Sequence, residues 1–75
     1  MTHANERQQI IQTIDSFSSL MKLKMLKKLG QGYHDWRDPN AIPDIDRRLS
    51  ENREKCDWVD VANCAMILFE LEAKR

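Results

Sequence analysis

The fold of this chain is decided by its last third, which from Asp57 to Glu72 reads DWVDVANCAMILFELE. The spacing predicts a helix that is apolar on almost every face, and a helix of that kind is normally buried. Its faces carry Trp58, Val61, Ala65 and Leu68; Val59, Ala62, Met66 and Phe69; and Ile67 with Leu71. A 75-residue chain buries only about 60% of the surface that it exposes when unfolded. We therefore expect a homo-oligomer whose subunits cover one another's apolar surface.

Composition limits the class of protein without deciding its function. Twelve basic and twelve acidic residues give a formal net charge of zero, so no overall field attracts polymeric nucleic acid or an anionic membrane. The sequence shows no signal-peptide pattern and no apolar run near the length of a membrane span. We therefore expect a cytoplasmic protein with no membrane or nucleic-acid polymer as partner.

The cysteines and histidines predict neither a metal site nor another cofactor. Cys56 and Cys64 are expected to be free thiols in a reducing compartment, Cys64 as a small core residue. His3 and His34 lack paired-ligand spacing with them.

The chain as a whole is predicted to be all-α: a single helical domain over residues 1–75 that forms a small three-helix protomer. Helices are expected at about residues 5–29, 43–55 and 57–73, with a structured loop over 30–42. Gly30 is the predicted stop of the first helix. Asp57 is a good N-cap for the third, with Asp60 as the acidic half of a capping box. Trp36 and Trp58 are predicted to anchor the core or an interface.

One stripe of the first helix combines an aromatic ring with cations. Phe17, Met21, Lys24 and Lys28 share a face at about 100° per residue, and residues 16–34 contain four lysines and no acidic residue. Such a face could stack a base on Phe17 and neutralise phosphates with the lysines. The alternative is a solvated helix end with Phe17 in the core.

The motif Asp57-x-x-Asp60 followed by Val61-Ala62-Asn63 resembles the second metal-ligand motif of the MazG-like all-α nucleotide pyrophosphohydrolases. That resemblance implies a magnesium site completed by clustered glutamates on an earlier helix. Here the preceding helix supplies Glu51 and Glu54 as a bare ExxE, and the first helix offers only Glu6 and Asp15. This carboxylate count is low for a two-metal phosphohydrolase. The sequence therefore favours a protein that is not an enzyme and has no catalytic residues.

A second resemblance covers most of the chain. A helix, a lysine-rich turn, Gly-Tyr-x-x-Trp-x-Asp-Pro, a short charged helix and Asp-Trp-Val-Asp-Val-Ala-Asn-x-Ala-Met together resemble phage proteins of the anti-CBASS cyclic-nucleotide sponge family. The matching residues are Gly32, Tyr33, Trp36, Asp38, Pro39, Asp57, Trp58, Val59, Asp60, Val61, Ala62, Asn63, Ala65 and Met66. The resemblance implies a helical homohexamer in the cytoplasm of an infected bacterial host. It also implies that the protein binds cyclic dinucleotides, such as cyclic GMP-AMP, or cyclic trinucleotides without cleaving them, which is a means of immune evasion.

The family's ligand contacts include a base-stacking aromatic and a lysine near the end of the first helix. Phe17 with Lys24 or Lys28 are the best local candidates for these roles. Tyr33 suits the edge of a wet pocket, and Arg37 could clamp a phosphate, although a salt bridge with Asp35 or Asp38 is the alternative for Arg37. A third class of function, a helical adaptor that binds another protein, would use the exposed leucines of the first helix.

Overall fold

The computed structural model of this protein describes residues 3–33 and 35–73, and these form helices and short turns with no β-strand. The predicted all-α, three-helix architecture is confirmed over these residues. The elements in order are α1 (His3–Gly30), the 3₁₀ helices η1 (Asp35–Arg37) and η2 (Pro39–Ala41), α2 (Ile42–Glu54) and α3 (Trp58–Ala73). His34 lies outside the described residues.

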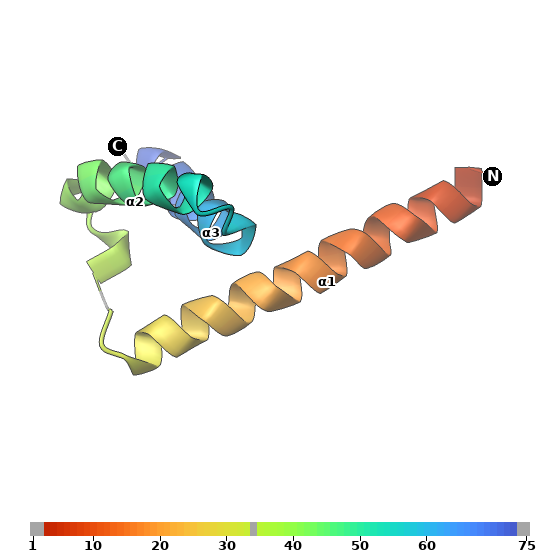
Figure 1. The fold of residues 1–75 in the computed structure, drawn as a ribbon, viewed down its shortest axis with the longest axis horizontal. Helices are drawn as coiled ribbons and strands as arrows, with labels where there is room; N and C mark the ends of the chain where they lie inside the picture. The colour runs from red at the N-terminus through yellow and green to blue at the C-terminus, as the bar shows by residue number, and fades with distance from the viewer. Residues whose placement is uncertain (1–2, 34, 74–75) are drawn as a thin grey trace.

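The long helix α1 stands apart from a pair formed by the other two (Figure 1). Helices α2 and α3 lie side by side, and α1 contacts α3. The N-terminal end of α1 projects far beyond the α2–α3 pair. Half of the longest helix therefore has no cover from the rest of its own chain.

The predicted structured loop is built from two turns of 3₁₀ helix. Pro39 occupies the first turn of η2, where its missing N–H costs nothing. The Asp38 carboxylate caps this turn by accepting a hydrogen bond of 2.9 Å from the backbone N–H of Asn40. These caps fix the path of the loop from α1 to α2.

Helix α1 ends differently from the prediction, because Gly30 is its last helical residue and Gly32 makes the stop. The N–H of Tyr33 donates to the carbonyl of Lys28, and that of Gly32 donates to the carbonyl of Leu29, each at 3.1 Å. This is a Schellman motif, which needs a left-handed residue at the position of Gly32; its φ is +95°. The motif folds Tyr33 back beside Lys28.

The corner between α2 and α3 uses one aspartate twice. Cys56 adopts a φ of +58°, and the N–H of Asp57 donates to the carbonyl of Asn52 at 2.9 Å, which closes α2. The Asp57 carboxylate then accepts a 3.2 Å hydrogen bond from the N–H of Asp60. The predicted N-cap at Asp57 is therefore confirmed, and it ties the end of α2 to the start of α3.

The buried core is small and lies between α2 and α3. Its apolar members are Ile45, Cys64, Ile67 and Leu71, and the side chains packed against them include Met25, Trp36, Ile42 and Leu49. Cys64 is a buried free thiol, as predicted, and burial raises its pKa.

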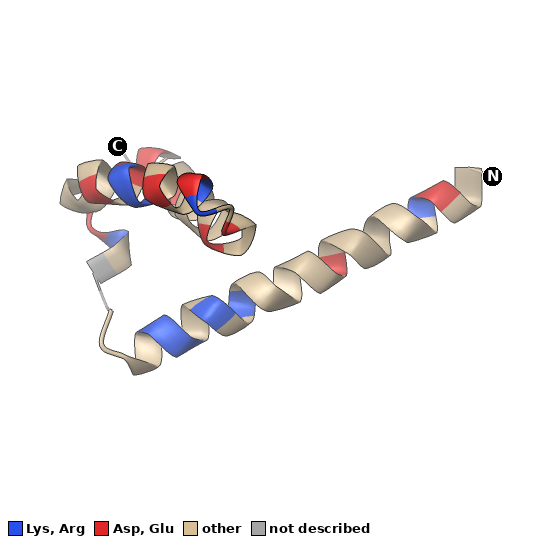
Figure 2. Ribbon diagram, in the orientation of Figure 1, with Lys and Arg blue, Asp and Glu red and all other residues tan. Residues whose placement is uncertain are grey.

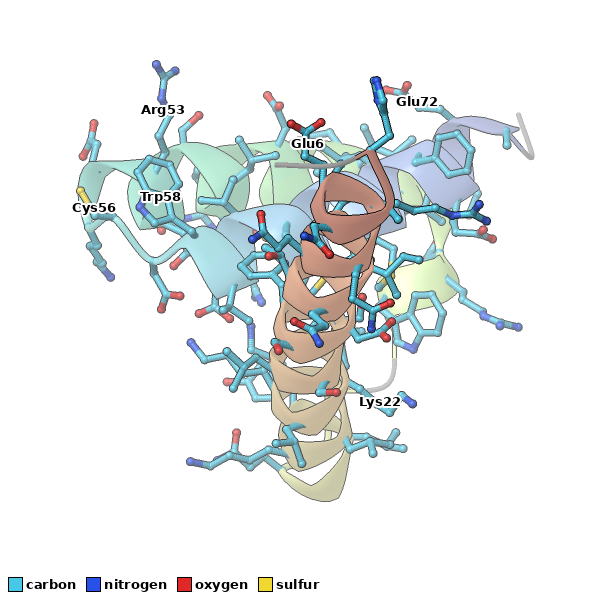
Figure 3. The ribbon with its side chains drawn as sticks, turned by 90° about the vertical axis from the view of Figure 1, so that its right-hand side faces the viewer. Glu6, Lys22, Arg53, Cys56, Trp58 and Glu72 are labelled. Carbon is cyan, nitrogen blue, oxygen red and sulfur yellow. The ribbon has the colours of Figure 1, made fainter. Side chains whose placement is uncertain are left out.

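Helix α3 is not buried on every face within the single chain, and that neighbouring subunits cover its remaining faces stays a prediction. Trp58 is 55% exposed and Phe69 is 72% exposed, so Trp58 is no anchor of this chain's own core. In Figure 3, Trp58 and Cys56 lie at the corner between α2 and α3, at the edge of the molecule. The buried residues of α3 are Asn63, Cys64, Ile67 and Leu71, which recur at helical spacing on one face.

Helix α1 carries apolar side chains without burying any of them, over the residues that the structure describes. More than half of the surface is exposed for Ile10, Ile14, Leu20, Leu23 and Leu26. This apolar surface is therefore presented on the outside of the protomer.

None of the described helices has the length and apolar character needed to cross a membrane.

Candidate functional site

Four charged side chains clasp the C-terminal half of α1 to the start of α3. Lys24 Nζ lies 3.0 Å from Asp57 Oδ2 and 3.4 Å from Asp60 Oδ2, and Lys28 Nζ lies 3.7 Å from Asp60 Oδ1. The lysines form the blue end of α1 in Figure 2. We call Lys24, Lys28, Asp57 and Asp60 the clasp.

The clasp gives Lys24 a structural role. Its hydrogen bond to Asp57 raises the pKa of the ammonium, and the same bond lowers the pKa of Asp57, helped by the backbone N–H of Asp60. The lysine stripe is therefore not a freely solvated helix end. That Lys24 also meets a ligand stays a prediction.

The clasp predicts a pH dependence of stability. The Asp57 pKa lies below its ordinary value of 3.8, so its contribution is present above pH 3.8 and is lost as pH falls further. The raised Lys24 pKa lies above 10.5, so its contribution is complete below pH 10.5 and is lost above it. We expect Asp57→Asn, which keeps a good N-cap, to unfold at a lower temperature than wild type at pH 7. The difference should shrink at pH 3 in thermal unfolding followed by circular dichroism.

The control for the clasp is Asp46→Asn, which removes one carboxylate from an exposed position of α2. Its thermal midpoint should stay close to that of wild type at both pH values, because exposed charges contribute little. If Asp57→Asn also matched wild type at pH 7, the clasp would have no role in stability.

Beside the clasp, the end of α1, the loop, α2 and α3 enclose a cavity of about 420 Å³. Apolar side chains make most of its wall, among them Met25, Leu29, Ile45 and Ile67. Small-molecule sites in proteins commonly have about 300–1,000 Å³ and a mainly apolar lining with a few polar groups. The cavity therefore has the size and character of a small-ligand site.

The polar lining of the cavity combines cations with aromatic rings. Lys28 and Tyr33 enter it together, because the Schellman motif at the end of α1 brings them side by side. The Arg48 guanidinium, from α2, lies 5.9 Å from the centre of the Tyr33 ring. Trp36 completes the aromatic part of the wall. Two cations and two rings from three segments thus face one space.

One carboxylate also lines the cavity and orients the arginine. Asp44 Oδ2 lies 3.0 Å from Arg48 Nε one turn along α2, and Arg47 also pairs with Asp44. The hydrogen bond from Arg47, with the charge of Arg48, lowers the pKa of Asp44. Asp44 therefore stays ionised and fixes one edge of the Arg48 fork, which leaves the other N–H groups for an anion.

The structure brings together only part of the predicted ligand-binding set. Lys28 and Tyr33 share the cavity, whereas Phe17 lies in a separate shallow hollow beside Gln12 and Leu20. The Arg37 guanidinium stacks 4.7 Å from the centre of the Trp36 ring, and Arg37 is not among the residues that line the cavity. Arg37 is therefore exposed on the surface, outside the cavity.

Arg48 and Asn63 line the cavity but were not in the ligand-binding set predicted from the sequence. Arg48 reads as one of several solvated charges on α2, and only the path of the loop turns it toward α1. Its one signal was the neighbouring Asp44 at i−4, a spacing that pairs side chains on a helix. Asn63 is a polar residue on an otherwise apolar helix, and such a residue must find a partner when it is buried.

Asp57 and Asp60, which the sequence motif suggested as metal ligands, form ion pairs with lysines in this structure. Both carboxylates face the lysines of the clasp, and Glu51 pairs with Arg47 on α2. Across residues 3–33 and 35–73, no three histidine, cysteine, aspartate or glutamate side chains gather closely enough to hold a metal ion.

Comparison with protein families, curated proteins and solved structures finds no match.

Proposed function

We propose that this protein binds cyclic oligonucleotide messengers, in particular cyclic dinucleotides such as cyclic GMP-AMP, and sequesters them without cleavage. The observation that carries the proposal is the cavity that Lys28, Tyr33 and Arg48 line together, with the Arg48 guanidinium over the ring of Tyr33. Stacking on an aromatic ring holds a base of any sequence, and charge-assisted hydrogen bonds hold phosphate. Together with the resemblance to the anti-CBASS sponges, these contacts support our proposal of a phage anti-defence protein that acts in the host cytoplasm.

The ligand has two phosphates and two bases, and one cavity offers contacts for about half of it. In the proposed complex a base stacks on Tyr33 while Lys28 and Arg48 neutralise the adjacent phosphate. A second copy of the chain, related by a two-fold axis, supplies the same set to the other half. Trp36 and the apolar wall keep water from the base.

Binding without hydrolysis is favoured by the state of the two acidic residues in the metal-ligand-like motif. A pyrophosphohydrolase would need the Asp57 and Asp60 carboxylates free for metal ions. Here Lys24 and Lys28 compensate their charge. The motif supports the helix corner and the clasp instead.

Calorimetry against a panel of cyclic di- and trinucleotides tests the proposal. We expect metal-independent binding and recovery of the intact ligand by chromatography after the protein is heat-denatured. Release of pyrophosphate from nucleoside triphosphates with magnesium or manganese would instead identify a pyrophosphohydrolase. If neither occurs and Leu23→Gln abolishes capture of a host protein, the chain is a helical adaptor.

We also propose that the protomer self-associates through α1, as a hexamer by resemblance to the sponge family. Ile10 and Ile14 are 59% and 57% exposed one turn apart on α1, and at about 100° per residue they continue the stripe of Phe17 and Met21. An apolar strip of this length on a small protomer is typical of an interface.

Replacing Ile10 and Ile14 together by glutamine is expected to convert the assembly into single chains at micromolar concentration. Light scattering coupled to gel filtration measures the change in mass. The control is Gln8→Ala with Gln12→Ala, a pair at the same spacing on the opposite face, which should keep the assembly. If the wild-type protein is itself a stable monomer, the proposal of an interface through α1 is contradicted.

A further inference from the structure

We propose that Asn63 reads the base held in the cavity, its side-chain carbonyl oxygen accepting a hydrogen bond from the exocyclic amino group of that base. This inference rests on the proposed function, since it takes the ligand to be a cyclic nucleotide. It assigns a specificity-determining residue on α3, beyond the cations and rings that hold phosphate and stack.

The amide of Asn63 is held with its oxygen free. Asn63 is 2% exposed, and its Nδ2 donates a 3.2 Å hydrogen bond to the backbone carbonyl of Met21 on α1. Because a carbonyl can only accept, the NH₂ group must face Met21, and Oδ1 must point the other way. That oxygen is buried and has no hydrogen-bond partner among the described residues.

An acceptor left in this state is unusual in a protein. Nearly all buried polar atoms have a partner, and an unpaired one loses its bonds to water without compensation. Asn63 lines the cavity, so a ligand there can supply the missing donor.

Asp60 is the other residue with an unpartnered buried oxygen in the described part of the chain. It lies one turn before Asn63 and already has the Lys28 ammonium 3.7 Å away. Asp60 is not among the residues that line the cavity. The need for a donor therefore falls on Asn63.

The chemistry of the missing partner is that of a purine amino group. Adenine carries an amino donor at C6 and guanine carries one at C2, whereas the positively charged groups of the site already serve the phosphates. Oδ1 has almost no surface open to water, so the base must displace a neighbouring side chain. Met25 also lines the cavity, and an unbranched thioether chain changes rotamer at little cost.

The test uses matched ligands that differ by one donor. Cyclic di-AMP is compared with its analogue in which purine replaces adenine, and cyclic di-GMP with cyclic di-IMP, which lacks the 2-amino group. For the wild-type protein we expect calorimetry to show at least tenfold weaker binding of the donor-lacking partner in one of the two pairs, about the value of one buried hydrogen bond. In Asn63→Leu, which keeps the branched shape of the side chain but has no acceptor, that difference should fall below twofold.

The control is Asn52→Leu, the same change on α2, where the Asn52 amide contacts Cys64 Sγ at 4.0 Å and the residue does not line the cavity. It should keep the discrimination of wild type. Asn63→Ala repeats the test if thermal unfolding shows that Asn63→Leu is not folded.

Two results overturn the inference. If wild type binds both members of each pair within twofold, no amino donor meets Asn63. If the discrimination persists in Asn63→Leu, another group reads the base and Asn63 only ties α3 to Met21. Absence of binding to all four cyclic dinucleotides would overturn the proposed function together with the inference, which distinguishes the two failures.

Discussion

Replacing Lys28 and Arg48 together by alanine is expected to lower the affinity for cyclic dinucleotides at least a hundredfold. Each cation supplies a charge-assisted contact to phosphate, and loss of one such contact costs about tenfold or more in binding. Both acidic neighbours keep a partner in the variant: Asp60 retains Lys24, and Asp44 retains Arg47. The protein should therefore stay folded, and calorimetry should report the loss of binding directly.

The matched control is Lys27→Ala with Arg47→Ala. These residues precede Lys28 and Arg48 in the sequence, are exposed and lie outside the cavity. The control removes the same charge and should bind within about threefold of wild type, because exposed charges act weakly at a distance. Equal loss in both double variants would show that only the overall positive charge matters, and the cavity would no longer be the site.

Leu71→Ala is expected to lower the free energy of unfolding by about 3 kcal/mol, the typical cost of a cavity at a buried leucine. Leu71 is 1% exposed and belongs to the core between α2 and α3. The core has few other members, and a chain of this length has a total stability of only about 4–11 kcal/mol. Urea unfolding followed by circular dichroism should therefore show the largest stability loss of any single core substitution.

Phe69→Ala is the control for this prediction. Phe69 is a larger side chain two residues earlier on α3, but it is 72% exposed. In the dissociated protomer its removal should change stability by less than about 0.5 kcal/mol. A loss comparable with that of Leu71→Ala would mean that the exposed face of α3 is covered in solution.

Local signals in the sequence predicted most of the fold. Helical periodicity located all three helices, and the N-cap at Asp57 followed from residue type and position alone. The stop of α1 was placed at Gly30 because both glycines suit a helix end, and only the backbone shows which one takes the positive φ. These signals depend on a few neighbouring residues, which the sequence displays directly.

The candidate site was predicted only in part, because it depends on contacts between distant segments. Lys28 and Tyr33 are five residues apart and are joined by one local motif, so both were found. Arg48 reaches them through the geometry of η1 and η2, which no periodicity encodes. Likewise, Phe17, Lys24 and Lys28 share a stripe of α1, but Lys24 and Lys28 meet the start of α3 in the clasp whereas Phe17 lies in a shallow hollow.

The attachment of α1 at one end has a mechanical consequence. The clasp begins at Lys24, and the helix extends from there to His3, about 30 Å at 1.5 Å per residue. A rotation of about 10° at the clasp would therefore displace the far end by about 5 Å, roughly one helical turn. Because the clasp adjoins the cavity, a small rotation of α1 about the clasp when a ligand binds would be amplified along the helix. It would move Ile10 and Ile14 farther than the residues near the ligand.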